Sequence, residues 1–310
     1  MSLPEALKSK LKLPVIAAPM FLVSGPKLVI ESCKAGIVGT FPALNERTTE
    51  GFEKWLVEIK SALGDDAAPY GVNLIVHKTN PRLKADLEMV VKHKVPVVIT
   101  SLGAVKDVVD AVHSYGGLVF HDVTNVRHGQ KALEAGVDGL IAVCGGAGGH
   151  AGTFNPFALV SELRQLTDKC IILAGSLSTG GDVLAARACG ADLAYMGTRF
   201  IATEESMAAP EYKQMVVQAK AADITYTPAV SGIPANFMRQ SLEKNGIDPK
   251  AVKDMNFGGE MAANEEAKAW KTIWSAGHGV SAINDIPKVA DLVGRMKSEF
   301  QAALERSSQF

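Results

Sequence analysis

The stretch that decides the fold is the apolar run Gly139-Leu-Ile-Ala-Val143, followed at once by Cys144-Gly-Gly-Ala-Gly-Gly-His-Ala-Gly-Thr153. The apolar run predicts a short buried strand. Five glycines then surround one histidine, His150. Glycine lets a backbone turn freely or lie directly against a bulky ligand. The same string also fits a flexible turn holding a solvated histidine, so its meaning depends on the rest of the chain.

Short apolar runs of this kind recur along the chain and alternate with segments whose apolar residues have helical spacing. Several helical segments end in glycine, for example Lys34-Ala-Gly36, as helices that close in the left-handed conformation do. Alternation of apolar strands with helices is typical of a parallel sheet covered on both faces. Eight such units predict an α/β fold, the TIM (β/α)8 barrel. The expected strands are 15–18, 36–41, 70–75, 95–101, 118–123, 139–143, 170–175 and 193–200.

An open doubly wound sheet is the alternative architecture. Its signature is a G-x-G-x-x-G/A turn early in the chain that leads into a helix. Gly146-Ala-Gly-Gly-His-Ala151 matches that string, but it lies in the middle of the chain and Gly-Thr-Phe-Asn-Pro follows it. We therefore interpret the match as accidental.

Composition argues against several classes of function. A formal net charge of -1 over 310 residues gives no electrostatic reason to expect nucleic acid or an anionic membrane surface as a partner. The apolar runs are short for a transmembrane helix, and the N-terminus lacks the pattern of a signal peptide. The four cysteines are widely spaced without a CxxC pair, which argues against a metal site. We expect a cytoplasmic protein without a metal, and the sequence carries no signal for an oligomeric state.

The alternating rhythm ends after the eighth expected strand, in a stretch with several prolines and the pair Gly258-Gly259. The pattern predicts helices over 236–245 and 262–270, and a final amphipathic helix over 286–304 that covers the barrel. We expect a barrel domain over residues 1–221, a small, mostly helical lid or substrate subdomain over 222–280, and a C-terminal helical part over 281–310.

The loops after the seventh and eighth strands carry small residues, and in a TIM barrel these two loops form the usual phosphate site. Gly175, Ser176, Gly197 and Thr198 suit that role, because backbone N–H groups and a helix start favour an anion. Any barrel has glycines in its loops, but here they occupy the two expected positions. Arg199 fits either a structural ion pair or a ligand contact.

Four motifs occur in a specific order: Ala18-Pro-Met20, Gly71-Val-Asn-Leu74, Ala147-Gly-Gly-His-Ala-Gly152 and Met196-Gly-Thr-Arg-Phe200. Together they resemble the nitronate monooxygenase (2-nitropropane dioxygenase) family, with its related NAD(P)H:quinone reductases and FMN-dependent enoyl-acyl carrier reductases. Each motif is weak alone, but their order and spacing are specific. The resemblance covers essentially the whole chain, from Leu13 to about Ile283.

The resemblance implies a TIM barrel that binds FMN non-covalently, with the flavin ring over the barrel mouth and His150 facing the substrate as the catalytic residue. In this family a flavin supplies the electron chemistry and the protein supplies orientation and polarity. The implied phosphate contacts are those of the two small-residue loops. The remaining implied cofactor-binding residues are Ala18, Pro19, Met20, Asn73, Ser101, Asp122, Gly148 and Gly149.

Two positions depart from relatives. Some members carry lysine where Asp122 stands, so this carboxyl either points away from the ring or tunes the flavin differently. Trp274-Ser-Ala-Gly-His278 stands where many relatives carry Ala-Gly-Gln. His278, with Met20, is therefore a candidate substrate contact, although a surface or capping role fits it equally well.

The resemblance implies oxidation of alkyl nitronates by O2, with nitrite and a carbonyl compound as products. A neutral imidazole at His150 can take a proton from a carbon acid or donate a hydrogen bond to a nitronate. The alternative keeps FMN but takes electrons from NAD(P)H and passes them to a quinone or an enoyl thioester. A barrel that only binds a phosphate ligand is a third hypothesis, which the position of His150 disfavours.

Overall fold

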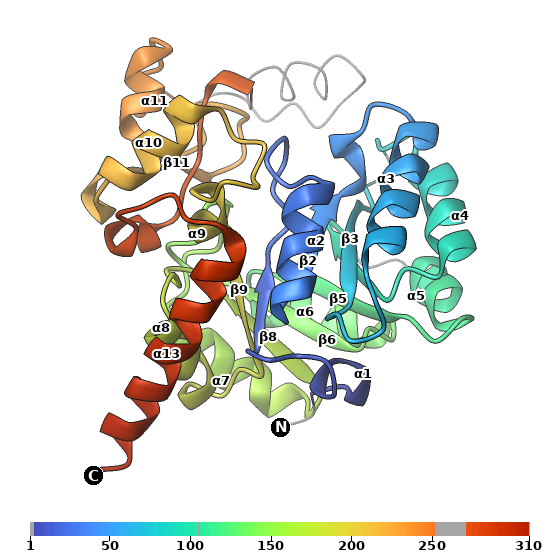
Figure 1. The fold of residues 1–310 in the computed structure, drawn as a ribbon. Helices are drawn as coiled ribbons and strands as arrows, with labels where there is room; N and C mark the ends of the chain where they lie inside the picture. Colours follow the sequence, from blue (N-terminus) through green and yellow to red (C-terminus); the bar gives the residue numbers. More distant parts are fainter. Residues whose placement is uncertain (1–2, 78, 104–105, 252–270, 310) are drawn as a thin grey trace.

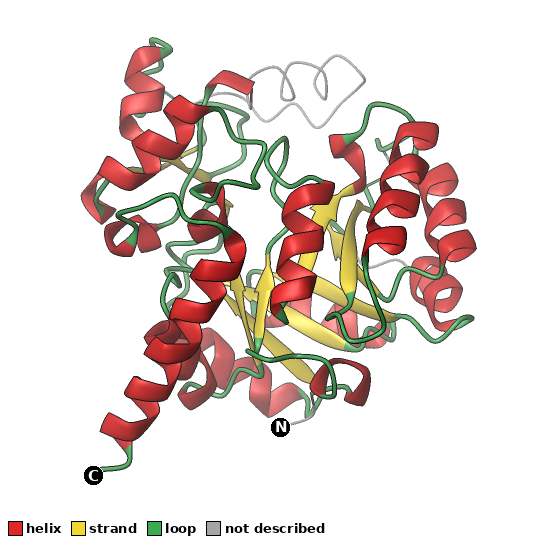
Figure 2. Ribbon diagram, viewed as in Figure 1, coloured by secondary structure: helices red, strands yellow, loops and turns green. Residues whose placement is uncertain are grey.

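The computed structural model describes residues 3–77, 79–103, 106–251 and 271–309. Eight strands in these ranges close into a barrel, and every neighbouring pair of strands is parallel (Figures 1 and 2). The closed barrel confirms the predicted TIM-barrel fold. In order around it, the strands are β1 (Val15–Ala17), β2 (Val38–Pro42), β3 (Tyr70–Ile75), β4 (Val97–Ser101), β5 (Leu118–Val123), β6 (Gly139–Val143), β8 (Cys170–Ala174) and β9 (Leu193–Met196).

Three expected strands have the observed bounds, namely β3, β5 and β6. The largest error concerns β9, which was expected to reach Phe200 but ends at Met196. Gly197 turns to helical backbone angles (φ -98°, ψ -62°), and the short helix α9 (Thr198–Ile201) begins there. The strand expected from Gly36 begins only at Val38, because Gly36 closes the preceding helix with a left-handed backbone (φ 92°).

Helices surround the barrel (Figure 2). The C-terminal helix α13 (Val289–Ser307) packs against both α8 and α2, so it closes the ring, and the expectation of a final helix on the barrel is confirmed (Figure 1). The other helices of the ring are α2 (Pro26–Ala35), α3 (Thr49–Ala62), α4 (Leu83–His93), α5 (Lys106–His113), α6 (Val126–Glu134), α7 (Pro156–Leu166) and α8 (Gly180–Ala188), with the 3-10 turn η1 (Ala43–Asn45) before α3.

The barrel interior is a packed apolar core. Leu7 of α1 (Glu5–Lys8) joins this core and is fully buried. Burying each large aliphatic side chain contributes about 1.5–3 kcal/mol, so this interior contributes to the stability of the barrel. Inward-facing members from the strands include Ile16, Val38, Ile99, Phe120, Ile141 and Ile172.

The described elements between α9 and α13 form a cluster at the upper left in Figure 1. It contains a hairpin, and β7 (Gly149–His150), from the glycine-rich loop, adds a third antiparallel strand to it. The helix expected over 236–245 is wrong at its start, because 236–238 pair with neighbouring strands and the helix begins at Arg239. The helix expected over 262–270 lies outside the described residues. The elements are α10 (Pro210–Gln218), η2 (Ala221–Asp223), β10 (Ile224–Thr227), β11 (Ala235–Met238), α11 (Arg239–Lys244) and η3 (His278–Ala282).

None of the helices in the described ranges combines the length and the hydropathy that crossing a bilayer requires.

Candidate active site

Three consecutive strands end in polar side chains that are hydrogen-bonded to one another. Side chains alternate along a strand, so Asp122 faces the same way as Phe120, into the barrel. Asn73 of β3 donates from Nδ2 to Ser101 Oγ at 2.8 Å, and Ser101 of β4 donates to Asp122 Oδ2 at 2.5 Å. The structure therefore joins three of the expected cofactor-binding residues in one chain, which we call the mouth triad (Asn73, Ser101 and Asp122).

The carboxyl group of Asp122 is poorly solvated. Its Oδ1 atom is buried and has no hydrogen-bond partner among the described residues. Burial raises the pKa of Asp122 to about 6, although the hydrogen bond from Ser101 opposes part of this rise. Tyr195 of β9 interacts with this carboxyl, and burial followed by the Asp122 charge raises the pKa of Tyr195 well above its usual value. Tyr195 therefore remains a neutral phenol at physiological pH.

The neighbouring His121 lies on the opposite face of β5 from Asp122. It is buried, and its Nδ1 lies 2.7 Å from Thr100 Oγ1. Burial lowers the pKa of His121 to about 4, with a further contribution from the charge of His128. His121 is thus a neutral core residue between the strand and the helices, and it does not belong to the mouth.

The loops after β8 and β9 present backbone N–H groups that the protein leaves unused. In the described part of the chain, the amides of Ser176, Leu177 and Gly197 donate no hydrogen bond to another residue. Ser176 is exposed and has a φ of 59°, a left-handed conformation that costs a non-glycine residue about 1–3 kcal/mol. Strain of this kind is concentrated at ligand-binding sites, so this loop is a candidate anion cradle.

Thr198, on the second of these loops, is buried and accepts a hydrogen bond at Oγ1 from the Gly277 amide at 2.9 Å. Its own hydroxyl hydrogen remains available to a ligand. Gly175 has a φ of 130°, and a Cβ there would lie 3.0 Å from the Gly145 carbonyl oxygen. Both the conformation and the space therefore require glycine at this position.

The start of α8 does not belong to the anion cradle, whereas the start of α9 at Gly197 and Thr198 lies in the second of the two loops. The amides of Ser178 and Thr179 both donate to Asp182 Oδ2 at 2.8 Å. The next amide, of Gly180, donates to Glu299 Oε2 at 2.7 Å. Carboxylates of the protein thus already occupy this helix start, and an anion would depend on the Ser176 loop and on the start of α9.

The glycine-rich loop is held by the small antiparallel sheet. His150 pairs with Ala235 of β11, and the adjacent glycine pairs with Asn236. The buried Asn236 side chain donates to the Ala147 carbonyl oxygen at 2.6 Å, and the Tyr226 hydroxyl donates to the Ala151 carbonyl oxygen at 3.1 Å. Both carbonyls flank the segment that carries His150, so its backbone is fixed on both sides and is not a flexible turn.

Gly148 of the glycine-rich loop lies against the backbone at Gly277, which His278 follows. A Cβ on Gly148 would lie 2.9 Å from the Gly277 amide nitrogen. His278 is exposed, and its amide donates to the Gly146 carbonyl oxygen at 2.9 Å. Added to Gly146, a Cβ would stand 2.3 Å from Ser176 Oγ and 3.0 Å from His278 Nδ1. The structure therefore places His278 beside the Ser176 loop.

The segment after β1 lies against the loop after β9. The amide of Ala18 donates to the Met196 carbonyl oxygen at 2.9 Å, and half-buried Pro19 and Met20 follow. A Cβ on Gly197 would be 3.5 Å from Met20 Sδ and 3.7 Å from Ala18 Cβ. The sequence-predicted residues after these two strands are therefore neighbours.

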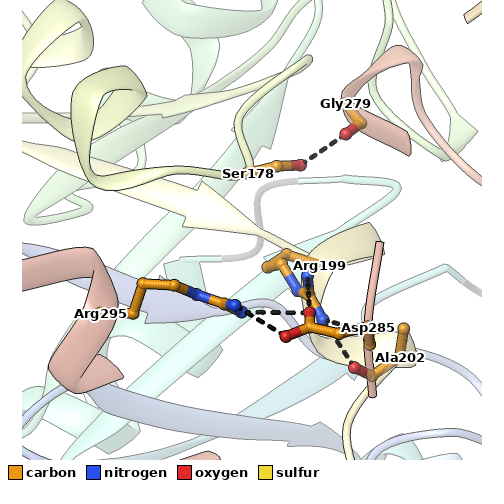
Figure 3. Close-up of polar contacts among 6 residues, drawn as sticks. All are labelled: Ser178, Arg199, Ala202, Gly279, Asp285 and Arg295. Carbon is orange, nitrogen blue, oxygen red and sulfur yellow. Dashed lines mark hydrogen bonds and ion pairs between the residues drawn. The ribbon is translucent and has the colours of Figure 1, made fainter. Parts of the chain in front are cut away.

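Arg199 is a structural residue (Figure 3). Its side chain is 2% exposed, and it binds the carbonyl oxygens of Ala202 and Asp285 at 2.8 and 2.9 Å and the Asp285 carboxylate at 3.2 Å. Arg295 of α13 binds the same carboxylate at 2.7 Å. Figure 3 also shows Ser178 donating to the Gly279 carbonyl oxygen, at 2.9 Å. Of the two roles open to Arg199, the structure thus shows the ion pair.

Sequence reasoning missed Asn236 and Tyr226, the two side chains that hold the glycine-rich loop. The alternation in Ile224-Thr-Tyr-Thr227, followed by the turn residues Pro228 and Gly232, is a hairpin signal. That signal indicates two strands, but it does not indicate that the histidine loop supplies the third.

Comparisons with known proteins agree with this geometry. The sequence model of the family described as nitronate monooxygenase matches residues 82–299. This chain belongs to the nitronate monooxygenase family. The nitronate monooxygenase of Paraburkholderia phytofirmans is 27% identical, over 96% of this chain and 94% of its own length.

Two solved structures extend the family likeness to the whole fold. FabK from Thermotoga maritima has a TM-score of 0.82 at 25% identity, covering 98% of this chain and 97% of its own. A nitroalkane oxidase from Streptomyces ansochromogenes has a TM-score of 0.81 at 25% identity, covering 97% of this chain and 99% of its own. This chain is an oxidoreductase of the nitronate monooxygenase family.

Proposed function

We propose that this chain binds FMN at the barrel mouth and oxidises an alkyl nitronate with O2, forming a carbonyl compound and nitrite. The observation that carries the proposal is the gathering of three features at one end of the barrel. These are the unused amides after β8 and β9, the mouth triad, and His150 on a strand anchored by the small sheet.

The residues present fit an FMN molecule. Its phosphate needs hydrogen-bond donors, which the Ser176 and Gly197 amides and the Thr198 hydroxyl supply. The flavin ring is flat and largely apolar, and small Ala18 beside the Met20 thioether offers a matching wall. In the mouth triad, Asn73 Nδ2 donates to Ser101 and to the Ile99 carbonyl oxygen, so its side-chain Oδ1 would be the atom left to accept from the polar edge of the ring.

FMN, when bound, supplies the electron transfer. The side chains of this protein bind and orient the reactants and exchange protons with them. His150 is suited to take a proton from the substrate or donate a hydrogen bond to a nitronate oxygen. Asn236 and Tyr226 hold the backbone on either side of His150, so the imidazole is carried on a fixed stretch of main chain.

The test is anaerobic mixing of the purified, FMN-loaded protein with propionate 3-nitronate, followed by flavin absorbance. We expect the nitronate alone to bleach the flavin rapidly. NADH and NADPH are mixed separately in the same way. Bleaching by a nicotinamide without any response to the nitronate would refute the proposal and favour the alternative reductase, whose acceptors would be quinones or enoyl thioesters.

A His150→Ala variant tests the assigned role. Loss of a general acid–base group typically reduces turnover by about 10²–10⁴-fold, and we expect a reduction of this size with the bound flavin unchanged. The matched control is His128→Ala, which removes an exposed histidine of α6. Full nitronate turnover by His150→Ala would exclude this residue from the chemistry.

A further inference from the structure

The mouth triad places a carboxyl group, Asp122, within the proposed cofactor site. We infer that Asp122 is a proton-binding residue of this site and takes up a proton when FMN covers the barrel mouth. Cofactor binding and protonation of this side chain would then be one coupled event. The inference rests on the proposed FMN site and adds the protonation state that the site requires.

The geometry leaves the Asp122 carboxylate only partly stabilised. One oxygen, Oδ2, accepts the Ser101 hydroxyl at 2.5 Å, while Oδ1 is buried without a hydrogen-bond partner in the described ranges. A carboxylate usually needs several donors when it is removed from water. Here the Asn73 amide is directed to Ser101 and not to the carboxyl. Protonation removes the unpaired charge on Oδ1, so the burial of this atom shifts the carboxyl toward the neutral acid.

Among the described residues, the side chains that face Asp122 from its own and the neighbouring strands supply no compensating cation. Tyr195, facing from β9, is neutral. From β6, the residues at this level are the apolar Ile141 and Val143, and from β4 the neighbour is the uncharged Ser101. On β5 itself, His121 points to the opposite face and stays neutral because burial lowers its pKa to about 4. Among these described neighbours, the ionised form of Asp122 would therefore be an unpaired negative charge.

A ligand that covers the barrel mouth shifts the protonation equilibrium of Asp122 further toward the neutral acid. Asp122 is still partly exposed, and its pKa of about 6 leaves roughly nine-tenths of the carboxyls ionised at pH 7. A flat ring laid over the mouth would remove the remaining water, and the FMN phosphate adds negative charge. Both effects raise the pKa of a carboxyl, so the bound state holds the proton.

Calorimetry on the full-length, flavin-free protein tests the inference with FMN as the ligand. The apparent binding enthalpy at pH 7 is measured in two buffers of different ionisation enthalpy, which gives the number of protons taken up. Asp122→Asn is the matched variant, since its amide mimics the neutral acid and can still accept from Ser101. We expect the wild type to take up as much as about nine-tenths of a proton more than the variant.

The same experiment at pH 5 supplies an internal control, because the carboxyl is then already protonated. The difference between the proteins should shrink there. Comparing the two proteins also cancels the titration of the FMN phosphate itself. Equal proton uptake by wild type and Asp122→Asn, with FMN bound to both, would overturn the inference and leave the proposed function intact. Failure of FMN to bind the wild type would overturn both.

Ser101→Ala supplies a second, independent readout. It removes the hydrogen bond that lowers the pKa of Asp122, so the carboxyl should become neutral at a higher pH. We expect the proton uptake at pH 7 to fall and the pH of maximal uptake to rise. A purely structural role for the mouth triad would leave that pH unchanged, and such a result would contradict the inference even if Asp122→Asn failed to fold.

Discussion

The contact between α8 and α13 provides a sharp test of how the barrel is closed. Gly180 lies in the first turn of α8, and a Cβ there would stand 1.9 Å from the Met296 carbonyl oxygen and 2.6 Å from the Phe300 nitrogen of α13. The next residue, Gly181, points elsewhere, and its nearest neighbour would be Thr179 Oγ1 at 3.6 Å. A Cβ is therefore sterically blocked at Gly180 and tolerated at the adjacent Gly181.

The magnitude for Gly180→Ala follows from this spacing. An ordinary contact begins near 3.4 Å, so α13 must withdraw by about 1.5 Å, and overpacking against backbone atoms costs about 3 kcal/mol. Gly181→Ala meets no such obstacle, and replacing glycine by alanine within a helix stabilises by about 0.5–1 kcal/mol.

The assay is urea unfolding of both variants and the wild type, followed by circular dichroism at one protein concentration. We expect the midpoint to fall clearly for Gly180→Ala and to stay or rise slightly for Gly181→Ala. Equal midpoints for the two variants would refute the reasoning, since helix propensity alone would then explain both.

Three further predictions follow from the same structure. Arg199→Lys should lower the free energy of unfolding by about 3 kcal/mol, because lysine cannot reach the two carbonyls and the Asp285 carboxylate together. An unchanged midpoint of urea unfolding would contradict this prediction. Asn236→Ala should reduce nitronate turnover by about tenfold with flavin content retained, since the Ala147 carbonyl loses its donor; unaltered turnover would remove Asn236 from the positioning of the loop. Burial lowers the pKa of His121 from 6.5 to about 4. Between these two pH values the native state therefore binds fewer protons than the unfolded chain. The free energy of unfolding should fall by about 3 kcal/mol as the pH is lowered from about 6.5 to 4. His121→Asn should flatten that part of the stability curve, and an unchanged acid slope would count against the buried neutral imidazole.

The barrel could be predicted from the sequence because its signals are local. An apolar run such as 139–143 must be buried on both faces, and a glycine such as Gly36 closes a helix wherever it occurs. The errors lie at the ends of elements. Phe200 continues the apolar pattern of β9, yet it belongs to a helix because Gly197 has already turned the backbone.

The mouth triad shows where local reasoning ends. Asn73, Ser101 and Asp122 were each expected at a strand end, but only the parallel register of β3, β4 and β5 links them by hydrogen bonds. The raised pKa of Asp122 depends on that arrangement and on burial by neighbouring strands. No spacing along the chain encodes either effect.

The sequence by itself determined the repeating βα unit, the positions of the loops that can carry chemistry and the residue types on them. Those properties depend on backbone propensity and on the burial of apolar side chains over a few turns of chain. Only the tertiary structure decided that His150 is a strand residue, because its partner Ala235 comes from a segment far along the chain. Backbone N–H and C=O groups must find partners wherever the fold brings them, so the glycines that indicate a flexible turn here form the edge of a sheet.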